Sequence, residues 1–129
     1  MKEPLWIDEE DALALHDHLI VLHGGAAGLR DKSSLQSALA RPRQRYAYAS
    51  APDIAALAAA YTAGIIGNHP FIDGNKRTGF VIGVLFLEIN GHNFTASEEA
   101  SAQAVLSLAA DTLDESAFAA WLRANLKRR

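Results

Sequence analysis

The chain has 129 residues, of which 50% are hydrophobic and 21% are charged, and its formal net charge is −3. This length fits one domain of the commonest size, so we expect a single domain over residues 1–129. The sequence contains no cysteine, which excludes disulfides, thiolate catalysis and cysteine-ligated metal sites. The negative charge argues against broad nucleic-acid binding by counterion release, so no direct nucleic-acid contact is expected.

No hydrophobic run in the sequence is long enough to span a bilayer. The longest run, Phe80 to Leu87, is far shorter than the roughly 20 apolar residues that a spanning helix needs. Residues 1–8 also lack a continuous apolar segment behind a basic start. We therefore expect a cytoplasmic protein with no membrane contact.

Capping residues and hydrophobic periodicity predict an all-α fold of about six helices. The first predicted helix follows an Asp8 cap and its acidic first turn, and it runs to about His23. The second begins at Asp31 or Ser33. It is expected to end before Pro42, after about two turns, because proline removes a helical hydrogen bond.

Two later segments are apolar on nearly all sides, which is typical of helices at the centre of a fold. These central helices are expected over about residues 52–68 and 75–90. Capping residues predict two further helices, over about residues 97–110 and 114–126. A small extended piece is the most strand that we expect, near residues 92–94.

The segment between the two central helices is the only dense polar stretch in an otherwise apolar region. It reads Asn-His-Pro-Phe-Ile-Asp-Gly-Asn-Lys-Arg-Thr over residues 68–78. The first turn of a helix carries partial positive charge on its unpaired N–H groups, yet Lys76 and Arg77 stand in that turn. This arrangement is favourable mainly if an anion such as phosphate binds among them. A structural polar turn without a ligand is the alternative interpretation.

Two residues of this stretch have the chemistry of phosphate transfer. His69 has a side chain that titrates near neutral pH, so it is a candidate general base for a hydroxyl nucleophile. Asp73 offers a hard oxygen ligand for Mg²⁺, which binds through one or two carboxylates together with substrate phosphates.

The next four residues are candidates for binding the phosphates. Gly74 would let the backbone approach the ligand closely, and Asn75 could donate a side-chain hydrogen bond to a phosphate oxygen. Lys76 supplies a point charge, and Arg77 can bind two oxygens with its planar guanidinium. Both cations are also candidate catalytic residues, because they would stabilise charge on the transferred phosphate.

Residues 69–78 resemble the signature of the Fic/Doc family, which in Fic adenylyltransferases reads His-x-Phe-x-Asp/Glu-Gly-Asn-Gly-Arg-x-x-Arg. Lys76 stands where that signature has its second glycine, and Phe80 stands where it has its final arginine. Both departures are typical of the Doc branch, the death-on-curing toxins of toxin–antitoxin pairs. Three further stretches are similar to Doc proteins, so the resemblance covers nearly the whole chain. They are residues 28–31, 37–42 and 85–91.

The resemblance implies a compact helical Fic-type fold and transfer of the ATP γ-phosphate to a hydroxyl of elongation factor Tu, which arrests translation. On matching positions, His69 would be the general base and Asp73 the magnesium ligand. The phosphate clamp would be Asn75, Lys76 and Arg77. A lysine at position 76 would crowd the groove in which Fic enzymes seat the α- and β-phosphates, so the nucleotide would bind in the reverse direction.

Two alternatives to a Doc-type kinase stay open. One is AMP transfer to a protein hydroxyl by the same loop, which Lys76 and Phe80 disfavour. The other is a non-catalytic protein that binds an antitoxin and tunes repression. The sequence has no match to the inhibitory helix, with its glutamate, of self-inhibited Fic proteins. The resemblance therefore implies restraint by a Phd-like antitoxin, whose disordered segment folds on binding.

Two other clusters are interpreted without a functional role. Three histidines of the first predicted helix show no metal-ligand spacing and are expected at the surface or half-buried. They are His16, His18 and His23. A group of arginines around a proline is interpreted as a solvated helix end. It consists of Arg41, Arg43 and Arg45.

Overall fold

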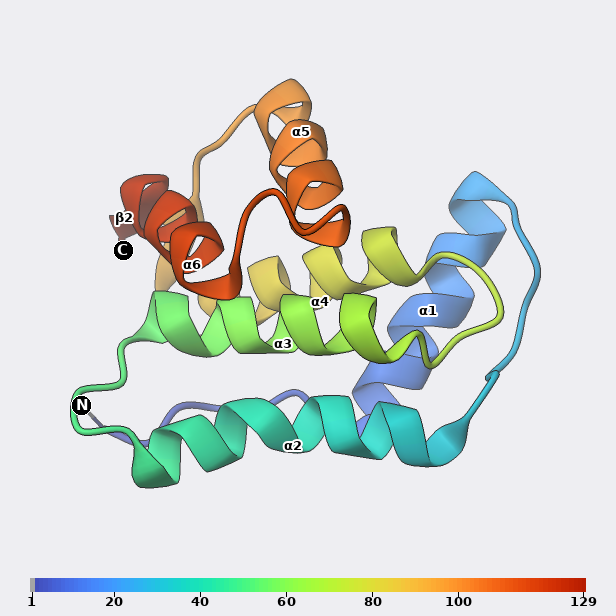
Figure 1. Cartoon of the computed structure of the whole chain (residues 1–129), viewed down its shortest axis with the longest axis horizontal. Helices are drawn as coiled ribbons and strands as arrows, with labels where there is room; N and C mark the ends of the chain where they lie inside the picture. Colours follow the sequence, from blue (N-terminus) through green and yellow to red (C-terminus); the bar gives the residue numbers. More distant parts are fainter. Residues whose placement is uncertain (1) are drawn as a thin grey trace.

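The computed structural model describes residues 2–129, which form six α-helices and one small sheet (Figure 1). Met1, the first residue of the expected domain, lies outside the described residues. The helices are α1 (Glu9–His23), α2 (Lys32–Tyr48), α3 (Ile54–Asn68), α4 (Asn75–Ile89), α5 (Glu98–Ala109) and α6 (Glu115–Ala124). The prediction of an all-α fold with about six helices is confirmed. No helix within residues 2–129 is both long and apolar enough to cross a membrane.

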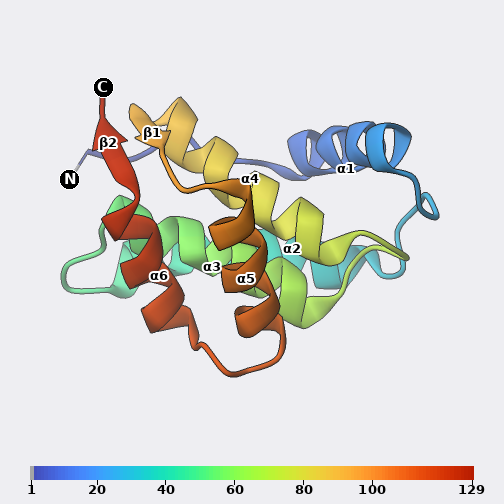
Figure 2. The same cartoon turned by 90° about the horizontal axis from the view of Figure 1, so that it is seen from above.

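The other four helices pack against the two central helices, α3 and α4 (Figures 1 and 2). Glycines on α4 let their backbones approach closely. A Cβ atom at Gly83 would stand 2.4 Å from the Thr62 hydroxyl of α3, and one at Gly79 would stand 3.2 Å from the Thr62 carbonyl oxygen. The Thr62 hydroxyl donates to the Gly79 carbonyl at 2.8 Å. This close packing fixes both ends of the polar loop that joins the two helices.

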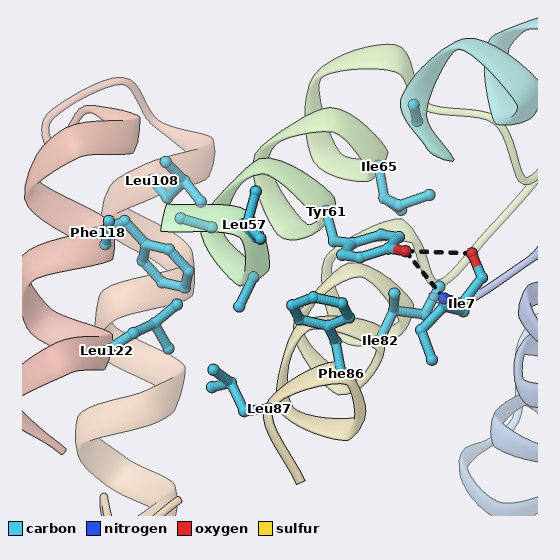
Figure 3. Packing of buried hydrophobic residues seen from close by; sticks show 14 of the residues in the cluster. Ile7, Leu57, Tyr61, Ile65, Ile82, Phe86, Leu87, Leu108, Phe118 and Leu122 are labelled. Carbon is cyan, nitrogen blue, oxygen red and sulfur yellow. Dashed lines mark hydrogen bonds between the residues drawn. The ribbon is translucent and has the colours of Figure 1, made fainter. Parts of the chain in front are cut away.

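The hydrophobic core lies around α3 and reaches the N-terminal segment through Tyr61 (Figure 3). Tyr61 is fully buried and packs its ring against Phe86 of α4, with ring centroids 5.0 Å apart. Its hydroxyl accepts from the backbone N–H of Ile7 at 2.9 Å and donates to the Ile7 carbonyl at 3.3 Å. Burial raises the pKa of Tyr61 to about 12, so this hydroxyl keeps its proton at neutral pH.

The prediction that Pro42 ends the second helix is wrong, because α2 continues through Pro42 to Tyr48. A proline inside a helix removes one hydrogen bond and crowds the carbonyl four residues earlier, here that of Ala38. That carbonyl oxygen would lie 3.3 Å from a Cβ atom at Gly64 of α3, so the glycine leaves room for it. The space that this carbonyl needs therefore comes from a neighbouring helix, α3.

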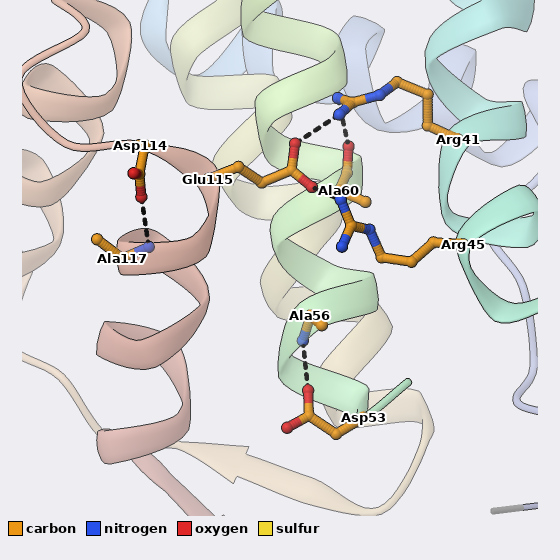
Figure 4. A network of polar contacts seen from close by, with 8 residues as sticks. All are labelled: Arg41, Arg45, Asp53, Ala56, Ala60, Asp114, Glu115 and Ala117. Atoms are coloured by element: carbon orange, nitrogen blue, oxygen red, sulfur yellow. Dashed lines mark hydrogen bonds and ion pairs between the residues drawn. The ribbon is translucent and has the colours of Figure 1, made fainter. Parts of the chain in front are cut away.

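The arginine cluster is also not a solvated helix end, because its members bind other elements. Arg41 and Arg45 both donate to the Glu115 carboxylate of α6, at 2.5 and 2.9 Å (Figure 4). The Arg43 guanidinium lies 5.2 Å from the centre of the Trp6 ring. The cluster therefore joins α2 to α6 and to the N-terminal segment.

The predicted extended piece near residues 92–94 is confirmed as β1 (His92–Phe94), and its partner is β2 (Leu126–Arg128). The strands are antiparallel, with His92 opposite Arg128 and Phe94 opposite Leu126. The prediction that the last helix continues to Leu126 is wrong, because α6 ends at Ala124. Pairing with a strand more than 30 residues away, at β1, draws the last residues out of the helix.

Replacement of Tyr61 by phenylalanine should lower the free energy of unfolding by about 1–3 kcal/mol, because it leaves the buried N–H and C=O of Ile7 without a partner. Urea denaturation followed by circular dichroism measures this change. Tyr48→Phe is the matched control, because Tyr48 is 87% exposed. Equal stability of the two variants would contradict a structural role for the Tyr61 hydroxyl.

Candidate functional site

The polar loop between α3 and α4 is organised by the side chain of Asn75, the first residue of α4. The Asn75 side-chain oxygen accepts from the Phe71 N–H at 2.9 Å. Its amide nitrogen donates to the Phe71 carbonyl and contacts Nδ1 of His69, each at 2.9 Å. Asn75 is only 6% exposed and both of its amide hydrogens are used. This arrangement differs from the expected side-chain bond to phosphate, because Asn75 holds the loop and its histidine.

His69 is fixed at its backbone and at its ring. It adopts a left-handed conformation with φ of 53° at the end of α3, which is uncommon for a non-glycine residue. Arg30 donates through Nε to the His69 carbonyl at 2.6 Å and through Nη2 to the Asn68 carbonyl at 2.8 Å. Because the Asn75 amide nitrogen faces Nδ1, the neutral ring carries its hydrogen on Nε2. His69 is an exposed residue, as a general base requires.

Asp73 joins the polar loop to the connection between α1 and α2. Its carboxylate accepts from the N–H of Ala26 at 3.1 Å and from the N–H of Gly74 at 2.8 Å. These two bonds, the Ala26 bond first, hold the pKa of Asp73 below its usual range. Gly25 has a φ of +118°, a left-handed value that favours glycine, and a Cβ atom there would stand 2.7 Å from the Asp73 carboxylate.

The Asp73 carboxylate fits a magnesium ligand that shares the ion with phosphates. It is exposed and ionised, and each of its oxygens accepts one hydrogen bond and keeps a free lone pair. Within residues 2–129, no group of three His, Asp or Glu side chains is placed to hold a metal ion. Mg²⁺ bound at Asp73 would therefore take its other ligands from phosphate oxygens and water, as this ion commonly does.

His16 of α1 contacts the polar loop. The prediction that it lies at the surface or is half-buried is wrong. The side chain is 1% exposed, and its Nε2 lies 2.8 Å from the Asp73 carbonyl oxygen. Its ring stacks on Phe71, with centroids 3.9 Å apart and planes 5° from parallel. His18 and His23 are exposed, as expected.

The backbone conformation of Gly74 favours glycine. Its φ is +77°, a left-handed value that favours glycine. A Cβ atom at this position would stand 3.5 Å from Ile20 and 3.8 Å from His16, so it would face α1. The close approach of a ligand at Gly74 stays a prediction, and the structure adds this conformational reason for glycine.

The N-terminus of α4 is open. Each of the other five helices has an Asp or Ser side chain that accepts from a first-turn N–H, whereas Gly74 provides none for α4. Lys76 and Arg77 in this first turn are exposed, and across residues 2–129 neither has a carboxylate within ion-pair distance. Unpaired N–H groups and two free cations together favour an anion.

A cavity of about 440 Å³ lies at this open end, and we call it the polar cavity. All six predicted site residues line it, together with three apolar ones. They are His69, Asp73, Gly74, Asn75, Lys76 and Arg77, with Ile66, Ile72 and Ala109. The residues that the sequence places in one phosphate-handling stretch therefore share one cavity.

The sequence comparisons identify the family of the chain. A model of the family described as "Fic/DOC family" matches residues 6–87, which is more than half of the chain. The chain belongs to the Fic/Doc family. This Fic/Doc chain is 33% identical over 115 residues to a protein of Escherichia phage P1 named "Protein kinase doc", which covers 83% of the chain and 91% of the relative.

A second relative is named "Toxin Doc" and comes from Mycolicibacterium smegmatis. It is 35% identical over 92 residues, which covers 70% of the Fic/Doc chain and 68% of the relative. The two relatives confirm the resemblance to the Doc branch.

Three supporting residues are missing from the sequence-based site: His16, Gly25 and Arg30. His16 had a signal, because Ala12, His16 and Leu19 share one face of α1 and the two apolar members are buried. Gly25 and Arg30 had no local pattern that indicates this role, since each acts on a loop more than 35 residues away.

Replacement of Asp73 by alanine should speed hydrogen exchange at the Ala26 amide, because this N–H loses its acceptor. The wild-type bond should weaken only as the pH falls through the lowered pKa of Asp73, since protonation then removes the charged acceptor. Nuclear magnetic resonance measures exchange at this amide. Glu10→Ala removes another exposed carboxylate and should leave Ala26 unchanged. Unchanged exchange in Asp73→Ala would contradict the link between the two loops.

Proposed function

We propose that this chain is the toxin of a toxin–antitoxin pair and that it transfers the γ-phosphate of ATP to a hydroxyl of elongation factor Tu. The observation that carries this proposal is the open N-terminus of α4, with its unpartnered Lys76 and Arg77, in one cavity with His69. Supporting evidence comes from the phage relative named "Protein kinase doc" and from the relative named "Toxin Doc".

The phosphates of ATP would bind to the first turn of α4. The backbone N–H groups of this turn have no side-chain acceptor, and Lys76 and Arg77 add two positive charges beside them. Asp73 would hold Mg²⁺, which would supply positive charge against the charge of the phosphates. A phosphoryl transition state needs chiefly positioning and charge stabilisation, which these residues provide.

His69 would accept the proton of the attacking hydroxyl. In the neutral ring the free lone pair is on Nδ1, where the Asn75 amide donates, so the hydroxyl has to replace Asn75 as the donor. The hydroxyl oxygen forms a bond to the γ-phosphorus, and its proton goes to Nδ1. The bond from this phosphorus to the bridging oxygen breaks, and ADP leaves with the electron pair.

A toxin of this kind needs restraint in its host. We propose that a Phd-like antitoxin supplies it with a disordered segment that folds on this chain. Elongation factor Tu as the substrate would place the reaction in the cytoplasm.

The direct test incubates the purified chain with elongation factor Tu, ATP and Mg²⁺ and records the intact mass of the target. We expect a gain of one phosphate. His69→Ala should slow this gain by about 100-fold or more, because it removes the general base. His23→Ala is the matched control, since His23 is exposed on α1 outside the polar cavity, and it should react as the wild type does.

Three results would contradict the proposal. A gain of one AMP in place of phosphate would make the chain an adenylyltransferase. An unmodified target would exclude elongation factor Tu as the substrate. Full activity of His69→Ala would remove the proposed base from the mechanism.

A further inference from the structure

Arg30 lies in the connection between α1 and α2, which runs beside the loop that joins α3 to α4 (Figure 1). Backbone hydrogen bonds join the two segments. The N–H groups of Arg30 and Asp31 donate to the Pro70 carbonyl at 2.7 and 3.1 Å. Arg30 does not line the polar cavity, so the phosphate chemistry proposed above does not use its side chain.

We infer that Arg30 is a positioning residue for His69 and that its guanidinium keeps the His69 ring in place in the polar cavity. The inference rests on the proposed function for the role of His69 and adds the group that holds it. Nε of Arg30 donates to the His69 carbonyl at 2.6 Å, and Nη2 donates to the Asn68 carbonyl at 2.8 Å. A guanidinium carries its donors in a fixed plane, so it can bind both carbonyls at once.

The two carbonyls belong to the C-terminal end of α3, which has no cation of its own. The last carbonyls of a helix have no partner within the helix and carry partial negative charge. Many helices end in a glycine or carry a basic residue in the last turn, whereas α3 ends at His69 and has no basic residue in that turn. Arg30 therefore supplies, from another part of the chain, the cation that α3 lacks.

The contact at the His69 carbonyl acts on the conformation of this residue. His69 has φ and ψ of 53°, a left-handed conformation that a residue with a Cβ atom rarely adopts. The direction of a carbonyl follows from ψ, so a donor at the His69 carbonyl restrains this angle. Pro70 comes next, and a residue before proline favours extended backbone. Without Arg30 we therefore expect His69 to shift toward extended backbone, which would move its ring.

The contact between Asn75 and the His69 ring does not replace this backbone contact. The Asn75 amide lies 2.9 Å from Nδ1, and in the proposed mechanism the hydroxyl of the target takes its place at this atom. The ring thus loses its contact with Asn75 when it is in use, whereas the bond from Arg30 to the His69 carbonyl remains. Arg30 is the group that holds His69 during transfer.

The test removes the donors of Arg30 in the full chain. Arg30 is exposed, so Arg30→Met keeps the aliphatic part of the side chain and leaves the core intact. Arg30→Lys keeps the positive charge but lacks the two fixed donors, so its effects should be intermediate. Arg128→Met is the matched control, because Arg128 is exposed on β2 and has no ion pair with another described residue. Circular dichroism checks the fold of each variant, and Arg30→Lys carries the test if Arg30→Met does not fold.

The first measurement needs no substrate. Nuclear magnetic resonance records the Cα and Cβ chemical shifts of His69, which differ between left-handed and extended backbone. In Arg30→Met these shifts should move toward extended values, with a smaller move in Arg30→Lys and none in Arg128→Met. Left-handed shifts in both Arg30 variants would overturn the inference, whether or not the chain transfers phosphate.

The second measurement separates positioning from binding. At saturating ATP, Arg30→Met should slow phosphate transfer to elongation factor Tu by about tenfold or more, because a small displacement of a reacting group can cost up to roughly 100-fold. The affinity for ATP with Mg²⁺, measured by calorimetry, should equal that of the wild type, since Arg30 lies outside the polar cavity. Arg128→Met should keep both the rate and the affinity.

An unchanged rate in Arg30→Met would overturn the role of Arg30 in positioning. A loss of ATP affinity as large as the loss of rate would also overturn it, because Arg30 would then support the phosphate site. A wild-type chain that transfers no phosphate would refute the proposed function, and the chemical shifts of His69 would still decide whether Arg30 holds its backbone.

Discussion

The side chain of Asn75 is the constraint on which the rest of the site depends. Its buried amide satisfies both backbone groups of Phe71 and reaches Nδ1 of His69. Leaving a buried polar group unpaired costs about 1–3 kcal/mol, so the loop has a strong reason to keep this shape. Because Asn75 is turned inward and Gly74 has no side chain, no side chain caps the first turn of α4. The N–H groups of this turn therefore stay free beside two cations, and together they form one anion site.

Two distant parts of the sequence hold this loop, the start of α4 and residues 16–30. α4 contributes Asn75, α1 contributes His16 beneath the Asp73 carbonyl, and the connection between α1 and α2 contributes Ala26 and Arg30. Each contact acts on the backbone or on an acceptor of the loop, so His69, in its left-handed conformation, is held from several sides. The site is thus a junction of rigid elements, which suits positioning as the main source of catalysis.

The sequence predicts the parts of this picture that depend on neighbouring residues. Three local patterns predict the site and the helical class. They are the cations in a first helical turn, the adjacent Asp73 and the apolar central helices. Features that depend on a distant partner are missed. Pro42 is tolerated because Gly64 makes room, β2 forms because β1 pairs with it, and His16 is buried because Phe71 stacks on it. The inward orientation of the Asn75 side chain is also missed, because its hydrogen-bond partners come together only when the loop folds.

The central claim is that the open N-terminus of α4 is an anion site held in shape by Asn75. The most direct measurement is a titration of the ¹⁵N-labelled chain with Mg²⁺ and ATP, followed by the backbone amide resonances. The account predicts that the largest changes fall on the amides of Asn75, Lys76 and Arg77, and that Asn75→Ala abolishes them while the chain stays folded. Unchanged resonances in this turn, with changes elsewhere or with full binding by Asn75→Ala, would contradict it.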